Sequence, residues 1–259
     1  MDQRHLRLEG VGNFRDFGGY AGRDGRRIKR GRLYRSAHHG MATDADLDAI
    51  AALDIAVIVD LRRGEERERM PSRRHAGFAG RLIENETNDA IADPWMEFVK
   101  GSDGSEGAFR GYLSDYYLNA PYQDRHIDLF RRYFQALAEA DGPVLIHCAA
   151  GKDRTGLLAA LTHQLMGVER DDIFEDYLLT NALAGIELRL PQVMQMIEAQ
   201  SGHKPTEAAA RAAMAVDATY LEAAFAAIVA SHGGLDAYIE DELGVDEAMR
   251  EAIALRLLA

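Results

Sequence analysis

The chain has 259 residues, and its 47% hydrophobic and 28% charged residues are ordinary for a soluble globular protein. A formal charge of −12 argues against nucleic-acid binding, which needs a basic face, and against broad adhesion to anionic membranes. One cysteine excludes an internal disulfide and a multi-cysteine zinc site. Since no signal peptide or membrane-length apolar run is visible, we expect a cytoplasmic protein without stable membrane insertion, export by an unusual route being the alternative.

The first half of the chain predicts strands and helices in alternation. Arg26–Lys29 and Arg32–Ser36 flank an Arg-Gly turn and predict a hairpin. Thr43 is expected to cap a helix that runs to about Leu53, and the β-branched run Ile55–Val59 is typical of a central strand. The remaining predicted elements are a short helix at Glu65–Met70, a strand at Phe78–Ile83, a long loop and candidate lid at Glu84–Gly107, and helices at Ala108–Asn119 and Tyr122–Ala140.

The second half predicts one strand, at Pro143–Ile146, and then helices only. The predicted helices are Gly156–Met166, Arg170–Asn181 with Asp171 as its N-cap, Ala182–Gln200, Thr206–Ser231, Leu235–Leu243 and Asp246–Leu258. The break at Ser201–Pro205 is too weak for a domain boundary. We therefore expect a single domain over residues 1–259, an α/β fold whose central sheet is flanked by helices and whose last third is helical.

The most informative segment is His147–Gly156, which reads HCAAGKDRTG. It joins the predicted strand to the next helix, where the free N–H groups of a helix N-terminus form an anion site. Cys148 at the mouth of that site is a nucleophile as its thiolate, and Arg154 can clamp two phosphate oxygens with its planar fork of donors. The groups expected to bind the phosphate are those of Ala149, Ala150, Gly151, Lys152, Asp153 and Arg154.

Three neighbouring residues are candidates for supporting roles. The hydroxyl of Thr155 is placed to hydrogen-bond the sulfur and so to help expel the thiolate from a phosphocysteine. His147 is interpreted either as a buried residue that orders the loop or as an ordinary core histidine. Arg62 follows a strand that ends beside the loop, so it either touches the substrate or forms an ion pair with Glu65 or Glu66.

The loop carries the cysteine, five-residue, arginine signature, and it resembles that of the bacterial atypical protein-tyrosine phosphatases with tyrosine, serine and lipid activity. Further matching segments are NFRDFGG (Asn13–Gly19), LYRS (Leu33–Ser36), DLR (Asp60–Arg62) and DYL (Asp176–Leu178), followed in the tail by Tyr220-Leu221, Tyr238, Leu243-Gly244 and Leu255-Arg256. The resemblance therefore spans nearly the whole chain. It implies a phosphatase-type sheet, no metal or cofactor, a phosphocysteine intermediate, and a phosphorylated protein or a phosphoinositide as substrate.

By this resemblance Cys148 is the nucleophile, Arg154 the phosphate clamp, Lys152 an extra cation and Asp153 the general acid. For the acid role, Asp60, Asp115 and Asp124 are alternatives. The only tryptophan, Trp95, lies in the order Asp-Pro-Trp, so we do not interpret it as the mobile Trp-Pro-Asp acid loop of other phosphatases.

Two function classes follow. The first is a cysteine phosphatase, and the alternative is a catalytically silent module that binds phosphorylated ligands; the intact loop favours the first. A Walker loop is excluded because Lys152 is followed by Asp, and a sulfurtransferase fits the Arg-Thr pair less well. We interpret the basic stretch over 26–35 as a solvated hairpin face rather than a lipid-docking site. The alanine-rich helices over 208–230 are interpreted as plain packing in preference to a lid.

Overall fold

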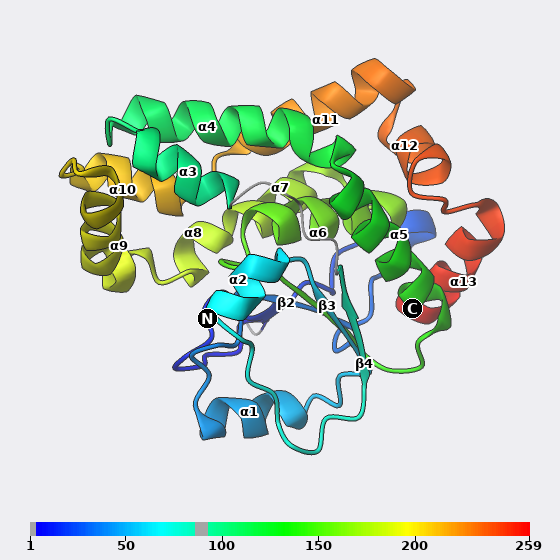
Figure 1. Cartoon of the computed structure of the whole chain (residues 1–259). Coiled ribbons are helices and arrows are strands. Elements are labelled where there is room, and N and C mark those ends of the chain that lie inside the picture. Colours follow the sequence, from blue (N-terminus) through cyan, green and yellow to red (C-terminus); the bar gives the residue numbers. More distant parts are fainter. Residues whose placement is uncertain (1–3, 86–92) are drawn as a thin grey trace.

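The computed structural model describes residues 4–85 and 93–259 and centres on a five-stranded sheet (Figure 1). The strands are β1 (Arg15–Asp16), β2 (Leu33–Ser36), β3 (Val57–Asp60), β4 (Arg81–Glu84) and β5 (Val144–His147), in the order β1-β2-β5-β3-β4. All neighbours are parallel except β1, which is an antiparallel edge strand. The carboxyl ends of the parallel strands are in register and carry Ser36, His147, Asp60 and Glu84.

The predicted hairpin is wrong. Leu33–Ser36 does form a strand, but its two edges are taken by β5 and β1. The segment before it pairs elsewhere, through bridges from Arg27 to Ala21 and from Ile28 to Leu258 near the carboxyl end. A central parallel strand has no free edge for a sequence neighbour, which is why the local turn signal misleads here.

Both faces of the sheet are covered. Because successive side chains of a strand point to opposite faces, Ile58 and Leu145 pack with Leu47 and Ile50 of helix α1 (Asp44–Ala51) on one side. Their neighbours along the same strands belong to the larger core cluster on the other side, to which several of the later helices contribute. Figure 1 shows α1 alone below the sheet and these helices gathered above it. The predicted α/β fold with a helical carboxyl-terminal third is confirmed.

The other helices follow in chain order. They are α2 (Gly64–Arg69), α3 (Pro94–Gly101), α4 (Glu106–Asn119), α5 (Asp124–Glu139), α6 (Asp153–Leu165), α7 (Arg170–Leu178), α8 (Thr180–Leu183), α9 (Ile186–Ser201), α10 (Glu207–Met214), α11 (Ala218–His232), α12 (Leu235–Asp241) and α13 (Glu247–Leu257), with 3-10 turns at Arg23–Gly25 and Ala120–Tyr122. No single helix in the described ranges is both long and apolar enough to cross a membrane; only α10 and α11 taken together, bent by 43°, reach that length and composition.

Several predicted helix boundaries need correction. The expected loop over Glu84–Gly107 contains α3, which starts because Asp93 caps it and Pro94 occupies its first turn; residues 86–92 of the proposed lid lie outside the described part of the chain. The cap of α7 is Glu169, with no side-chain bond, instead of Asp171. The long helix expected over Thr206–Ser231 breaks before Asp217, whose carboxylate caps α11.

Candidate active site

The cysteine loop lies at the carboxyl end of β5, the middle strand, where the crevice of an open α/β sheet binds ligands. Cys148 is 2% exposed and lines a cavity of about 300 Å³. The helix after the loop, α6, starts at Asp153, earlier than predicted, and its N-cap Lys152 forms no side-chain capping bond. The first N–H groups of α6 therefore have no capping side chain and remain available to an anion.

The carbonyl groups of the loop are held by donors from β2, from the residues just after it and from the segment before β1. Gly151 O accepts from Asn13 Nδ2 at 2.7 Å and from Arg35 Nη2 at 3.1 Å, and Ala149 O accepts from the His38 N–H at 3.2 Å. In a trans peptide the N–H points opposite to the C=O. The amides that follow these carbonyls, those of Ala150 and Lys152, therefore point away from the sheet side of the loop.

Gly151 is required where the loop meets β2. Its φ is +67°, which other residues rarely adopt, and a Cβ there would lie 2.4 Å from the carbonyl carbon of Ser36. The loop thus rests directly on the backbone of β2.

The donors on the loop are themselves anchored in a buried ion cluster. Asp176 of α7 accepts from Arg15 Nε at 3.0 Å and from Arg35 Nη1 at 2.6 Å, and all three side chains are almost completely buried. Arg15 also donates to the side-chain oxygen of Asn13. Burial alone would raise the pKa of Asp176, but the two guanidinium groups outweigh it and hold that pKa well below its usual value.

Arg154 is oriented by Glu66 of α2, a contact that the sequence analysis missed. Arg154 Nη2 donates to Glu66 Oε1 at 2.7 Å, and Nη1 donates to Glu66 Oε2 and to Leu61 O at 3.2 Å. Burial alone would raise the pKa of Glu66, but the charge and hydrogen bonds of Arg154 lower it to about 2. A guanidinium has five N–H donors, and among the described residues nothing accepts from Nε–H or from one Nη2–H. These two lie on a single edge, a fork of the kind that suits two phosphate oxygens.

Asp153 also lines the cavity, and two donors converge on one of its oxygens. Tyr117 of α4 donates its hydroxyl to Oδ1 at 3.1 Å, and Lys152 Nζ approaches the same oxygen at 3.1 Å. Tyr177 of α7 donates in turn to the Tyr117 hydroxyl at 2.8 Å. This leaves the second carboxylate oxygen without a donor among the described residues.

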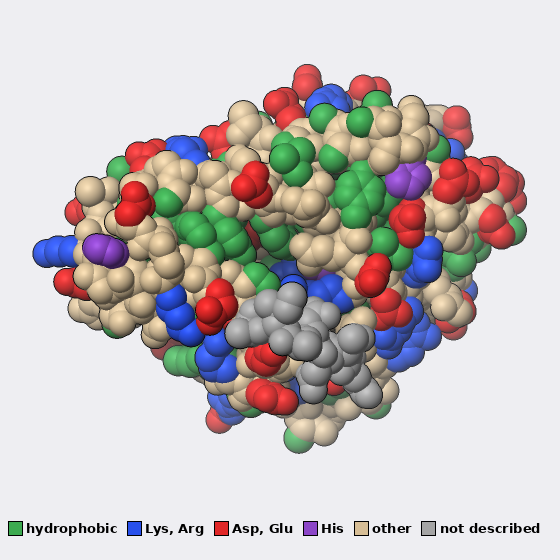
Figure 2. All heavy atoms as spheres, turned by 45° about the horizontal axis from the view of Figure 1, so that its top comes forward, with side chains coloured by type: hydrophobic (Ala, Val, Ile, Leu, Met, Phe, Trp, Pro, Cys, Tyr) green, Lys and Arg blue, Asp and Glu red, His purple; other side chains and the backbone are tan. Residues whose placement is uncertain are grey.

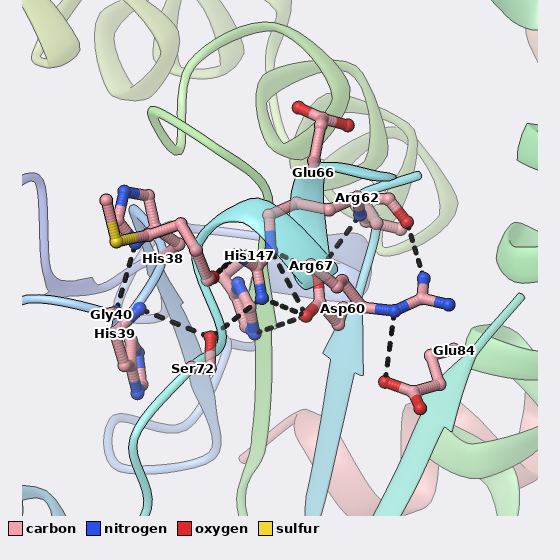
Figure 3. A network of polar contacts seen from close by, with 12 residues as sticks. His38, His39, Gly40, Asp60, Arg62, Glu66, Arg67, Ser72, Glu84 and His147 are labelled. Carbon is pink, nitrogen blue, oxygen red and sulfur yellow. Dashed lines mark hydrogen bonds and ion pairs between the residues drawn. The ribbon is translucent and has the colours of Figure 1, made fainter. Parts of the chain in front are cut away.

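Arg62 does not line the cavity, and neither of its expected partners binds it. Its guanidinium, 2% exposed, binds Asp60 through Nη2 at 2.7 Å and through Nε at 2.9 Å. Figure 3 shows Arg62 and His147 converging on Asp60, with Ser72 between Arg62 and the backbone of His39. The expected ion pair with Glu65 or Glu66 is wrong because Asp60, two residues away, is already within reach.

The other predicted positions are now placed. His147 is buried, stacks on His39 at 5.1 Å between ring centroids, and has Nε2 3.7 Å from Asp60. Thr155 is buried with its hydroxyl unpaired among the described residues, so the bond expected between it and the sulfur is not formed in this arrangement. Among the alternative acids, Asp115 and Asp124 are exposed and Asp60 is enclosed behind the loop; none of the three lines the cavity.

Asp60 is also unsuited to donate a proton. Burial alone would raise its pKa, yet contacts with His147 and Arg62 hold that pKa well below the usual value. Of these two partners only Arg62 is charged at neutral pH, because burial lowers the pKa of His147. Asp60 therefore stays ionised as the structural partner of Arg62.

The outer wall of the cavity is apolar and comes from helices far along the chain. The aromatic and aliphatic lining residues include Trp95 of α3, Tyr112 and Tyr116 of α4, Met196 of α9 and Met214 of α10. Figure 2 shows Lys and Arg side chains at the bottom of the hollow in this face, with hydrophobic side chains along its upper wall. The alanine-rich α10 both packs in a core cluster and contributes to this wall.

The basic stretch over 26–35 is not the uniformly solvated face that we expected. Arg35 is completely buried against the loop, and Lys29 donates to the carbonyls of Leu255 and Arg256 near the carboxyl end. Over residues 4–85 and 93–259, no group of three or more His, Cys, Asp or Glu side chains is arranged to hold a metal ion.

Comparison with known proteins agrees with this geometry. The family model described as the tyrosine phosphatase family matches residues 6–259. A protein of Cupriavidus necator that carries the name of a tyrosine-protein phosphatase is 33% identical over 250 residues, 95% of this chain and 86% of that one. The triple specificity protein phosphatase PtpB of Mycobacterium tuberculosis is 30% identical over 266 residues, 93% of this chain and 94% of that one. A tyrosine-protein phosphatase of Nostoc commune is 33% identical over 149 residues, 56% of this chain and 47% of that one. The chain therefore belongs to the tyrosine phosphatase family, and it is an enzyme of the protein-tyrosine phosphatase class.

Proposed function

We propose that this phosphatase hydrolyses phosphate monoesters through a covalent phosphocysteine on Cys148. The observation that carries the proposal is the convergence of Cys148, Asp153 and the free edge of Arg154 on one cavity at the start of α6. The thiolate attacks phosphorus, the P–O bond to the alcohol or phenol breaks, and the leaving oxygen takes a proton from Asp153. Water then attacks the phosphocysteine and gives a proton to the Asp153 carboxylate, the S–P bond breaks, and inorganic phosphate and the thiolate are released.

The remaining residues of the loop have supporting roles in this proposal. The amides of Ala149, Ala150, Gly151, Lys152 and Asp153 surround the phosphoryl oxygens, and the Arg154 fork closes the ring. The unpaired hydroxyl of Thr155 is available to donate to the thiolate as it leaves in the second step. His147 supports the loop from beneath, and Arg62 acts on the strand end rather than on the substrate. The chemistry needs only these side chains and amides.

For the substrate, we propose phosphotyrosine first, with phosphoserine, phosphothreonine and phosphoinositides as further candidates. A nearly buried sulfur beneath aromatic walls from Trp95 and Tyr112 suits a long, flat phenyl phosphate. The name of the relative PtpB, a triple specificity phosphatase, supports the wider range. A panel of phosphotyrosine peptides, phosphoserine peptides and phosphoinositides ranks these classes by kcat/KM.

The mechanism is tested with two aryl phosphates that differ in their leaving group. Cys148→Ser should abolish turnover of p-nitrophenyl phosphate, and the wild-type rate should be unchanged by a chelator and blocked by vanadate. Asp153→Asn should lower kcat about 100-fold for phenyl phosphate and much less for p-nitrophenyl phosphate, whose leaving group needs no proton. Equal losses on both substrates would move the acid role away from Asp153. Phosphate binding with no turnover by the wild type would instead favour the silent binding module.

A further inference from the structure

Asp153 accepts a hydrogen bond from the end of a chain of two tyrosines that no other part of the mechanism uses. Tyr177 donates to Tyr117 at 2.8 Å, and Tyr117 donates to Asp153 Oδ1 at 3.1 Å. Both tyrosines are 1% exposed, and they come from α7 and α4, which are separate in sequence. Two large buried side chains with their hydroxyl groups aligned toward one carboxylate oxygen form a specific support for that oxygen.

The direction of this chain follows from counting protons. Each phenol has one O–H, and Asp153 Oδ1 is an acceptor both when the carboxyl group is ionised and when its proton is carried on Oδ2. Tyr117 must therefore donate a hydrogen bond to Asp153, and Tyr177 must donate a hydrogen bond to Tyr117. Burial raises the pKa of Tyr117 well above 10, and the neighbouring Asp153 raises it further, so the phenol stays protonated at neutral pH.

Lys152 makes the two carboxyl oxygens of Asp153 different, because it contacts only Oδ1. Its ammonium lies 3.1 Å from the same Oδ1 and also 3.4 Å from Ala215 O, and the side chain is nearly buried. An oxygen that already accepts from an ammonium and a phenol is a poor place for a proton. The other oxygen, Oδ2, has no donor among the described residues and belongs to a side chain that lines the cavity.

We propose that Tyr117, supported by Tyr177, is a positioning residue that fixes Asp153 through Oδ1, so that the proton for the leaving group is carried on Oδ2. This inference rests on the proposed function, in which Asp153 is the general acid. As the S–P bond to Cys148 forms and the P–O bond breaks, the proton moves from Oδ2 to the leaving oxygen. The carboxylate that results is then held by Tyr117 and Lys152 on its other oxygen.

The test compares Tyr117→Phe with a matched buried tyrosine. Tyr117→Phe removes one hydroxyl, and we expect kcat for phenyl phosphate to fall about tenfold while KM and inhibition by inorganic phosphate change less than about twofold. Turnover of p-nitrophenyl phosphate should fall by less than about twofold. Tyr177→Phe should give a smaller loss of the same kind, because Tyr117 still donates.

Tyr133→Phe is the control, because Tyr133 is completely buried and its hydroxyl bonds Thr162 Oγ1 at 3.0 Å, away from the cavity. It should lower thermal stability as Tyr117→Phe does but leave the ratio of the two aryl phosphate rates unchanged. A loss in Tyr117→Phe that is equal on both substrates, or a change of that ratio in Tyr133→Phe, would overturn the inference.

A double-mutant cycle separates this inference from the function on which it rests. In the Asp153→Asn background Tyr117→Phe should have no further effect on phenyl phosphate, because its action passes through the carboxylate. An undiminished tenfold loss there overturns the inference alone. If Asp153→Asn itself loses equally on both substrates, the acid assignment fails and the inference falls with it. If Asp153→Asn is selective and Tyr117→Phe is not, only the inference fails.

Discussion

At the scale of single residues, the site is organised before any substrate arrives. The Arg154 guanidinium is held on one side by Glu66 and Leu61 O, which leaves its free edge for phosphate. Preorganised donors stabilise transition-state charge without reorganising during the reaction, which is the largest contribution to many catalytic rates. In the proposed mechanism Glu66 therefore acts on the phosphate through Arg154, although it also lines the cavity.

Glu66→Gln tests this role. The neutral amide keeps the shape but loses the charge and one of the two acceptors, so Arg154 should be less firmly held. We expect kcat/KM for p-nitrophenyl phosphate to fall about 10- to 100-fold and inhibition by inorganic phosphate to weaken. Glu65→Gln is the matched control, because it makes the same charge change on the same helix without lining the cavity. Equal activity in the two variants would remove Glu66 from the site.

The sequence pointed to the residues that we propose carry the chemistry but not to those that orient them. Cys148, Asp153 and Arg154 lie close together in one loop, and the spacing of these residues is the sequence pattern that predicts the site. Glu66 appeared only as a partner for Arg62, and Tyr117 had no signal beyond its place in a predicted helix. These contacts depend on how α2 and α4 pack against the loop. Glu66 and Arg154 are 88 residues apart in the sequence, so no local sequence pattern predicts their ion pair.

At the scale of elements, the loop is tied to β1, β2 and α7 by the buried cluster of Arg15, Arg35 and Asp176. Two guanidinium groups and one carboxylate leave a net positive charge beneath the loop. Burying charges costs desolvation free energy, and this cost is offset in part because Arg35 Nη2 reaches Gly151 O and Arg15 Nη1 reaches the Asn13 side chain. The NFRD and LYRS segments and Asp176 thus support one loop from three elements.

Asp176→Asn should show what the cluster contributes to folding. It leaves two guanidinium groups buried beside one another without a counter-ion, so the free energy of unfolding should fall by about 3–5 kcal/mol. Urea denaturation at neutral pH measures this. Asp171→Asn is the control, since Asp171 is exposed on the same helix and should change stability by no more than about 1 kcal/mol. A loss in Asp176→Asn no larger than in the control would contradict a structural role for the cluster.

Elements with a local signal were predicted well, and those fixed by distant partners were not. Thr43 caps α1 as expected, and the β-branched run forms β3. The hairpin failed because β5, more than 100 residues later, occupies the edge of β2. The long carboxyl-terminal helices were divided where Gly185 adopts φ 63° and where Asp217 caps α11, since alanine-rich composition alone does not show an interruption.

At the scale of the whole molecule, we propose that the chain folds as one domain. The largest core cluster includes Val57 and Ile146 of the sheet, Phe134 of α5 and Ile253 of α13. Strands and carboxyl-terminal helices thus bury the same apolar surface. A single cooperative unfolding transition is the expected result, and two separated transitions by calorimetry would contradict it.

The same cooperative unit should lose stability as pH falls, in two windows of the same sign. The buried histidines titrate in the first window. Burial lowers the pKa of His126 to about 3, so between pH 6.5 and 3 the unfolded chain binds a proton at this residue and the folded chain does not. Below about pH 4.5 the depressed pKa values of Glu66, Asp60 and Asp176 have the same effect, because those groups stay ionised only when folded.

His126→Gln isolates one proton of the first window. Above pH 6.5 both states leave His126 neutral, so its contribution is flat there and is lost as pH falls. Urea unfolding at several pH values between 7.5 and 5 measures how steeply the free energy of unfolding depends on pH. Below pH 6.5 this slope should be smaller in the variant than in the wild type by about 1.4 kcal/mol per pH unit. His203→Gln, on an exposed turn, should leave the slope unchanged. Parallel curves of unfolding free energy against pH for the wild type and His126→Gln would mean that His126 is protonated in the folded protein. The interior beside the cavity would then be more hydrated than the burial of His126 implies.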